Sequence, residues 1–137
     1  MKRNVSVTKI MTAEVTTVHL GQPLSEVRQA MQAGGFHHVP VVSGGKLIGI
    51  LSSTDLLNVS YAYGEDARTT DAVLDHTVSI EKLMKEPVTV ETSSTIRDAT
   101  EILAEGQFHA IPVVDEAGKL EGLVTSTDIL RYFLEQY

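Results

Sequence analysis

The chain carries one short motif of a hydroxyl and a carboxylate at two places, Ser52-x-x-Asp55 and Thr125-x-x-Asp128. A carboxylate accepts hydrogen bonds from both hydroxyls of a ribose, and a serine or threonine hydroxyl can donate to a phosphate. Each motif lies where an apolar run passes into a helical pattern, and the free N–H groups of a helix start also attract anions. The same spacing is typical of a capping box, which only closes a helix end. We therefore keep two interpretations, a ligand contact and a helix cap, which use the same groups.

Three of the five histidines also occupy matching places, directly before an apolar run that contains a proline; they are His37, His38 and His109. Their repetition favours contact with a ligand, whereas a single histidine beside a strand more often packs its ring and bonds a backbone carbonyl. A shared metal ion is a third interpretation. Because His37 and His38 are adjacent, however, they should point to opposite faces of a strand. We therefore predict no metal site.

These residues belong to a longer stretch that is written twice at a nearly constant offset. The first copy contains Val7, Ile10, Met11, Val15, Thr16, Pro40, Gly49, Ser53, Thr54 and Asp55. The second contains Ile80, Leu83, Met84, Val88, Thr89, Pro112, Gly122, Ser126, Thr127 and Asp128. A short repeated unit usually has one face that it cannot bury alone. We expect the two copies to pack on each other, with any ligand where they meet.

The apolar residues of the first copy predict a helix followed by a hairpin. After Pro23, residues 24–31 are apolar at helical spacing, and Gly34-Gly35 should end the helix. Two compact apolar strands follow at 39–42 and 47–51, and the glycines between them indicate a tight turn. The motif Ser52-x-x-Asp55 then begins a second helix.

The second copy repeats each of these steps. Its helix, glycine stop and two strands are predicted at 96–103, Gly106, 111–114 and 120–124. A short extended piece should precede the helix of each copy, at 15–18 and 88–90. The order strand, helix, strand, strand, helix predicts an α+β fold. We expect a first unit at 1–57, a helix tail and linker at 58–79, and a second unit at 80–137.

Composition disfavours several classes of function. The 137 residues are 42% hydrophobic, which suits two small cores that share an interface. The net charge of −7 repels nucleic-acid phosphates, so we expect no nucleic-acid partner. The chain has no cysteine and therefore no disulfide or thiolate metal site. Because no apolar run resembles a signal peptide or a membrane span, we expect a cytoplasmic protein that does not enter a membrane.

Together these residues resemble a tandem pair of CBS domains, the family named after cystathionine beta-synthase. The resemblance extends from about Val7 to Leu130. It rests on two leader segments, Ile10-Met11-Thr12 and Leu83-Met84, and on the proline-containing strands at 36–42 and 108–114. It also rests on the strand ends that carry the two motifs, at 49–55 and 122–128.

The resemblance implies two units packed sheet to sheet around a pseudo-two-fold axis. Clefts between them would hold AMP, ADP, ATP or S-adenosylmethionine as a regulatory ligand, with no required cofactor and no catalysis. The resemblance also implies a homodimer that acts on a separate effector protein, which is not identified.

The resemblance further implies which residues contact the ligand. In the cleft closed by Thr125 and Asp128, the base would contact Thr12, Thr16 and Phe36. In the cleft closed by Ser52 and Asp55, it would contact Lys85, Thr89 and Phe108. His37, His38 and His109 would approach the phosphates, although the family often has arginine where this chain has His38 and Ala110.

Two other functions stay open at this point. A ligand-free dimerisation or assembly module would fill the clefts with its own side chains. A small hydrolase would need a nucleophile, a base and a group that orients the base, and the sequence pattern does not place such a trio together. We therefore predict that the protein is not an enzyme.

Overall fold

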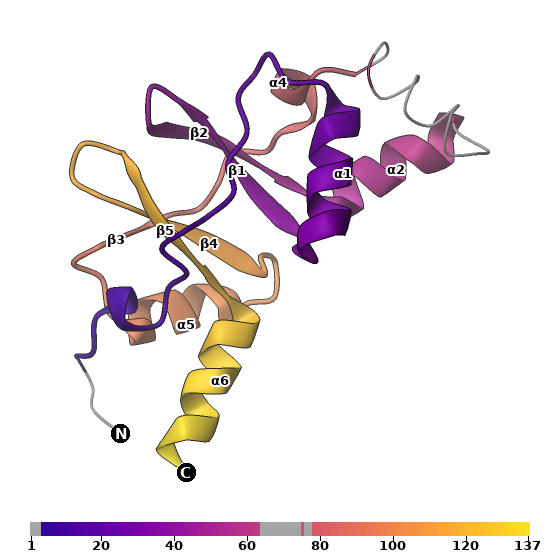
Figure 1. Cartoon of the computed structure of the whole chain (residues 1–137). Coiled ribbons are helices and arrows are strands. Elements are labelled where there is room, and N and C mark those ends of the chain that lie inside the picture. The colour runs from indigo at the N-terminus through magenta and orange to yellow at the C-terminus, as the bar shows by residue number, and fades with distance from the viewer. Residues whose placement is uncertain (1–3, 64–74, 76–77) are drawn as a thin grey trace. The chain divides into compact units, whose positions relative to one another are not determined.

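A computed structural model describes residues 4–63, 75 and 78–137 of the chain (Figure 1). The described residues form two compact units, and neither is a continuous segment. The β1–β2 unit contains residues 16–44, 48–63, 75 and 78–86. The β3–β5 unit contains residues 4–15, 45–47 and 87–137. Each unit therefore includes the leader segment of the other sequence repeat.

The β1–β2 unit is built from a helix, a hairpin and a second helix. Helix α1 (Leu24–Gly34) ends at Gly35, which takes the left-handed conformation with φ of 68°. Strands β1 (His38–Ser43) and β2 (Lys46–Ser52) pair through a turn whose two glycines both have positive φ. Helix α2 (Ser53–Tyr63) follows directly from β2 (Figure 1). The glycine turn between β1 and β2 matches the twist of these two strands.

One face of this hairpin and of its helices forms a hydrophobic core, supplemented by the short leader helix α4 (Ile80–Leu83). The buried members of the core are Val18, Leu24, Val27, Met31, Val39, Val41, Leu51, Leu56 and Ile80. The α1 members recur at helical spacing, and this periodicity predicted the helix.

The β3–β5 unit has a three-stranded sheet in the order β3-β4-β5. Strand β3 (Val90–Glu91) is parallel to β4 (Ala110–Val114), and helix α5 (Ile96–Ala104) connects them. Strand β5 (Leu120–Thr125) is antiparallel to β4 and leads into helix α6 (Ser126–Gln136). A parallel pair needs such a crossover, whereas a hairpin suffices for an antiparallel pair.

The core of this unit also includes its leader, the 3-10 helix η1 (Val7–Lys9). The buried members are Val7, Val90, Ile96, Ala99, Leu103, Ile111, Val113, Val124 and Ile129. The backbone N–H of Val7 donates to the Ser94 carbonyl at 3.0 Å, and that of Ile96 donates to the Val5 carbonyl at 2.8 Å. These bonds join residues that are far apart in the sequence.

Each leader crosses a glycine of the neighbouring strand. In the β3–β5 unit, Thr12 forms two backbone hydrogen bonds with Leu123, and Met11 lies against Gly122. In the β1–β2 unit, Lys85 forms two with Ile50, and Met84 lies against Gly49. Because a methionine occupies the space that a Cβ would need, only glycine fits both places without displacement.

The predicted α+β class is confirmed, and both helix–hairpin segments lie where the patterns place them. The opening strands differ from the expectation. Of residues 88–90 only Val90 belongs to β3, and of residues 15–18 only Val18 pairs, as an isolated bridge to Val41. Both predicted strands were therefore wrong in extent.

The predicted division at 1–57, 58–79 and 80–137 follows the sequence repeats and stays a prediction. Helix α2 continues to Tyr63, and most of the predicted linker lies outside the described residues. In the described part of the chain, no helix has the length and apolar character needed to cross a membrane.

Replacing Gly122 by alanine should destabilise the protein more than replacing Gly49. A Cβ at Gly122 would lie 2.8 Å from the Thr12 carbonyl oxygen, which the backbone bonds to Leu123 hold in place. The three atoms nearest to a Cβ at Gly49 all belong to the Met84 side chain, and the two closest, Sδ and Cγ, can move by rotation of that side chain. We expect Gly122→Ala to lower the free energy of unfolding by about 1–3 kcal/mol, and Gly49→Ala by less. Urea denaturation measures both.

Gly21→Ala is the control, because no atom lies within 4 Å of its Cβ and its φ is not positive. It should leave stability unchanged or slightly raised. Equal losses at Gly49 and Gly122 would contradict the assigned role of the Thr12 backbone.

Candidate functional site

The Thr125–Asp128 motif begins helix α6 as a capping box. The Thr125 N–H donates to Asp128 Oδ2 at 2.8 Å, and the Asp128 N–H donates to Thr125 Oγ1 at 3.2 Å. The other carboxylate oxygen, Oδ1, lies 3.9 Å from Arg131 Nη1. This distance exceeds that of a hydrogen bond, so the cap uses one oxygen and leaves the second weakly engaged.

The Ser52–Asp55 motif has the same cap but a different charge environment. The Ser52 N–H donates to Asp55 Oδ2 at 3.0 Å, and the Asp55 N–H donates to Ser52 Oγ at 3.1 Å. Asp55 Oδ1 also lies 2.9 Å from Lys85 Nζ. Burial raises the pKa of the Asp55 carboxyl, but hydrogen bonds from Lys85 and Ser52 and the charge of Lys85 lower it more. The resulting pKa lies below the ordinary value of 3.8.

Two histidines lie at the same helix starts. The carbonyl of His37 accepts a hydrogen bond from the Ser53 N–H at 2.8 Å, and the carbonyl of His109 accepts one from the Ser126 N–H at 3.0 Å. Both histidines are exposed. His38 begins β1 and is partly buried. The backbones of His37 and His109 are thus beside the two motifs, and His37 Nδ1 lies 3.4 Å from Ser53 Oγ. The main-chain carbonyl of each of these two histidines accepts a hydrogen bond from the first amide of its helix.

This arrangement revises the expectation of free amides at the helix start. In α6, the Ser126 N–H is bonded to His109 and the Asp128 N–H to Thr125. A phosphate could use these two amides only by displacing their bonds. The carboxylate oxygen Oδ1 is the more accessible group, and hydroxyl donors suit it better than an anion does.

The leaders bring one further predicted residue to each motif. The bonds between Thr12 and Leu123 set Thr12 beside β5, close to the start of α6. The bonds between Lys85 and Ile50 set Lys85 beside β2, where its ammonium reaches Asp55. The ammonium of Lys85 contacts the Asp55 carboxylate of its own unit, and the predicted contact of Lys85 with a base stays a prediction.

The other predicted residues lie farther along the two units. Thr16 and Thr89 are exposed, and Phe36 packs partly against the β1–β2 core. Phe108 lines a cavity of about 550 Å³ whose other walls include Asp98, Glu101 and Glu105. Three carboxylates around one cavity disfavour a phosphate there.

The structure therefore brings together one predicted group within each unit. In the β3–β5 unit this group is Thr12, His109, Thr125 and Asp128, and in the β1–β2 unit it is His37, Ser52, Asp55 and Lys85. The predicted pairing of Thr16 and Phe36 with Asp128, and of Thr89 and Phe108 with Asp55, combines residues of different units and remains a prediction.

A smaller cavity borders Asp128. It has a volume of about 190 Å³ and is also lined by Lys9, Ile10, Arg131, Tyr132 and Glu135. The sequence analysis missed Lys9 and Arg131. The spacing of Asp128 and Arg131 on one helix was the available signal, because residues three apart share a face. Among the described residues, no group of three or more histidine or acidic side chains is placed to hold a metal ion.

The family pattern described as CBS domain matches residues 7–62 and again residues 80–135. The two matches together include more than half of the chain and coincide with the two sequence repeats. The chain therefore belongs to the CBS domain family, as a tandem pair.

Comparison with individual proteins agrees with this assignment. The chain is 35% identical over 128 residues to MJ1225 of Methanocaldococcus jannaschii, covering 90% of this chain and 45% of that protein. The crystal structure of MJ1225 superposes with a TM-score of 0.80 at 30% identity, over 95% of this chain and 48% of that one. The chain thus spans less than half the length of MJ1225 and of several other curated relatives.

Two shorter structures share the fold over nearly their whole length. CBSX2 of Arabidopsis thaliana in complex with AMP has a TM-score of 0.81 at 24% identity, covering 96% of this chain and 98% of that one. The CBS domain pair of MJ0100 in complex with 5-methylthioadenosine and S-adenosyl-L-methionine has a TM-score of 0.77 at 23% identity. That match covers 98% of this chain and 100% of that one. At these identities the comparison establishes the fold.

Replacing Asp55 by asparagine should reduce stability at neutral pH, and the loss should shrink in acid. A carboxyl whose folded pKa is depressed stabilises the fold above its unfolded value of 3.8, and this contribution disappears as the pH falls through the lower folded pKa. We expect Asp55→Asn to cost about 1–3 kcal/mol at pH 7, because it breaks a charge-assisted hydrogen bond. Urea denaturation at neutral pH and below 3.8 measures the change.

Asp128→Asn is the matched control, since it alters the same cap without a hydrogen-bonded lysine. It should cost less at neutral pH. An Asp55→Asn loss that is the same at both pH values would show that the ion pair with Lys85 does not stabilise the protein.

Proposed function

We propose that this chain is a regulatory module that senses an adenosine-containing ligand, namely AMP, ADP, ATP or S-adenosylmethionine, and controls a separate effector protein. The ligand acts as a regulator and undergoes no reaction. A chain without cysteine suits a reducing compartment, so the proposed location is the cytoplasm.

The geometry of Asp128 is the observation that carries this proposal. Its Oδ2 holds the helix cap, whereas its Oδ1 has, among the described residues, an ion contact with Arg131 at 3.9 Å, and Asp128 lines a cavity. A carboxylate in this state can accept hydrogen bonds from the two neighbouring hydroxyls of a ribose. Proteins of the same fold have been crystallised with AMP, with S-adenosylmethionine and with 5-methylthioadenosine, and these ligands share the adenosine group.

The cavity beside Asp128 accounts for only part of such a ligand. Its volume of about 190 Å³ lies below the roughly 300–1,000 Å³ of typical ligand pockets. The remaining contacts are those proposed from the family resemblance. For the base they come from Thr12, Thr16 and Phe36 at the Asp128 site and from Lys85, Thr89 and Phe108 at the Asp55 site. The three histidines would approach the phosphate.

A ligand can regulate a partner only if it binds two states of the module unequally. Differential affinities of this kind usually supply about 1–3 kcal/mol of coupling. Because Asp128 lies in the first turn of α6, a ligand bound to Asp128 would act directly on the position of that helix. Helix α6 would then transmit the change to the effector protein.

Asp128→Ala should weaken AMP binding at its site by at least about tenfold, because the ribose hydroxyls lose their acceptor. Isothermal titration calorimetry with AMP, ATP and S-adenosylmethionine measures the affinities of both variants. Binding of AMP with both sugar hydroxyls present should also exceed that of 2′-deoxy-AMP.

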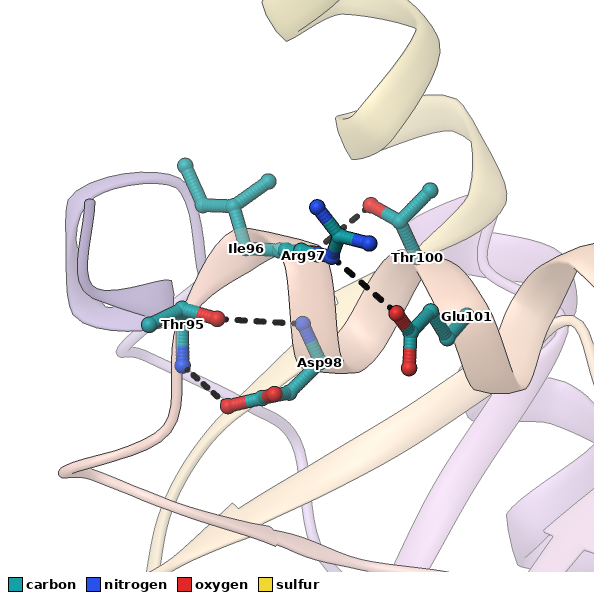
Figure 2. A network of polar contacts seen from close by, with 6 residues as sticks. All are labelled: Thr95, Ile96, Arg97, Asp98, Thr100 and Glu101. Atoms are coloured by element: carbon teal, nitrogen blue, oxygen red, sulfur yellow. Dashed lines mark hydrogen bonds and ion pairs between the residues drawn. The ribbon is translucent and has the colours of Figure 1, made fainter. Parts of the chain in front are cut away.

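Asp98→Ala is the control for damage to a helix cap. Thr95 and Asp98 form a third capping box at the start of α5, with distances of 2.8 and 3.1 Å, but outside both motifs (Figure 2). This change should lower stability without changing AMP affinity. If no ligand of the panel binds more tightly than millimolar, or if Asp128→Ala and Asp98→Ala behave alike, the proposal is wrong.

A second function, assembly, is favoured by the outer face of α6. Leu130 and Leu134 are 64% and 76% exposed, and Phe133 and Tyr137 extend the same apolar row. Ile129, the residue before Leu130, is instead buried in the core of the β3–β5 unit. A row of this spacing suits a self-complementary contact with a second copy of the chain, so we propose a homodimer through α6. Assembly and ligand sensing are compatible.

Leu134→Glu should convert the dimer to a monomer at micromolar concentration, because a charge would be buried in the apolar contact. Light scattering coupled to size-exclusion chromatography measures the mass. Gln136→Glu adds the same charge to an exposed polar position of the same helix and should leave the dimer intact. A monomeric wild-type protein at that concentration would contradict the α6 dimer.

A further inference from the structure

The duplication allows the two carboxylates to be compared in nearly the same backbone setting. Thr12 and Lys85 are counterparts in the repeats, and each forms two backbone hydrogen bonds with a counterpart strand residue, Leu123 or Ile50. Asp128 and Asp55 close the same kind of cap, with Oδ2 bonded to a backbone N–H at 2.8 and 3.0 Å. Differences in the surrounding side chains therefore distinguish the two carboxylates.

Those side chains give the carboxylates different partners. Asp55 Oδ1 receives the Lys85 ammonium at 2.9 Å, so both of its oxygens are engaged. Threonine, the counterpart of that lysine, carries no charge. Asp128 Oδ1 instead has Arg131 at 3.9 Å, and the counterpart of Arg131 in the first repeat is Asn58.

The two ion contacts also differ in how easily a sugar can replace them. The two carboxylate side chains are buried to nearly the same extent, 7% and 11% exposed, but only Lys85 lies within hydrogen-bond distance of its carboxylate oxygen, at 2.9 Å against 3.9 Å for Arg131. A ribose hydroxyl is a neutral donor and is a weaker partner for that oxygen than an ammonium. Lys85 itself is 72% exposed, so water competes for it and its displacement is possible at a moderate loss of affinity.

We propose that Lys85 occupies the ligand-accepting oxygen of Asp55, so that the chain has two unequal nucleoside sites and the Asp128 site fills first. The inference rests on the proposed function. Lys85 then determines how readily the Asp55 site is occupied, and the group recognised there is the pair of vicinal hydroxyls of a ribose. A ligand at Asp55 must first break the ion pair with Lys85, and the Asp128 site makes no such demand.

Exchanging the counterpart residues tests this inference. Lys85→Thr gives the Asp55 motif the leader residue of the other repeat, and Thr12→Lys does the reverse for Asp128. AMP binding is measured by calorimetry, with Asp128→Ala and Asp55→Ala in each background to assign the sites. Thermal unfolding without ligand verifies that each variant folds.

Wild type should bind one AMP per chain at a concentration where the Asp55 site is mostly empty, and Asp128→Ala should remove that binding. Lys85→Thr should strengthen the Asp55 site by about tenfold, which raises the stoichiometry towards two. Thr12→Lys should weaken the Asp128 site by a similar factor. Because the two exchanges fall in different units, failure of one variant to fold leaves the other informative.

The outcomes separate this inference from the proposed function. Two sites of equal AMP affinity in wild type would overturn the role of Lys85 while nucleotide binding stood. So would unchanged AMP affinity in both Lys85→Thr and Thr12→Lys. Absence of AMP binding in wild type and in Lys85→Thr would overturn the proposed function and this inference together. Binding in Lys85→Thr but not in wild type would overturn the proposal that the Asp128 site fills first, while nucleotide binding itself stood.

Discussion

The hydrogen bond from the last strand amide to the motif carboxylate is the contact on which both the fold and the candidate site depend. A helix start leaves several N–H groups without partners, and the chain must satisfy them where β2 turns into α2 and where β5 turns into α6. Ser52 with Asp55, and Thr125 with Asp128, do so reciprocally. The cap fixes Oδ2 and thereby also fixes where Oδ1 lies. The proposed ligand contact and the observed helix cap thus involve the same carboxylate.

The leaders add a second constraint that comes from distant parts of the chain. Met11 and Thr12 lie against β5, whereas Met84 and Lys85 lie against β2. Each compact unit is therefore completed by residues from the other sequence repeat. The glycine beneath each methionine allows the leader backbone to approach the strand, and this approach brings Lys85 within reach of Asp55.

The sequence predicted what local patterns encode. The apolar period of α1 and α5, the glycines of the β1–β2 turn and the two capping motifs are each determined by neighbouring residues. Helices η1 and α4 are too short to show a period. The strand expected at 15–18 had the right composition, but only Val18 pairs.

The candidate site was predictable in its residue types and less so in its contacts. The repeat identified Asp55, Asp128 and the histidines, because they occupy matching places. The ion pair between Lys85 and Asp55 depends on leader exchange, which joins residues that no local pattern connects. The approach of Lys9 to Asp128 across a cavity has the same origin.

The two repeats carry different residues at positions where the fold does not require a particular side chain. Gly49 and Gly122 are the same residue because a leader methionine covers both, and Asp55 and Asp128 are the same because both close a cap. The side chains that set the charge around those carboxylates lie at the surface, with Lys85 72% and Arg131 67% exposed. Substitution at such positions changes stability little, so the backbone of the two motifs can stay alike while their electrostatics diverge. A duplicated chain can in this way keep one architecture and acquire two carboxylates with different charged partners.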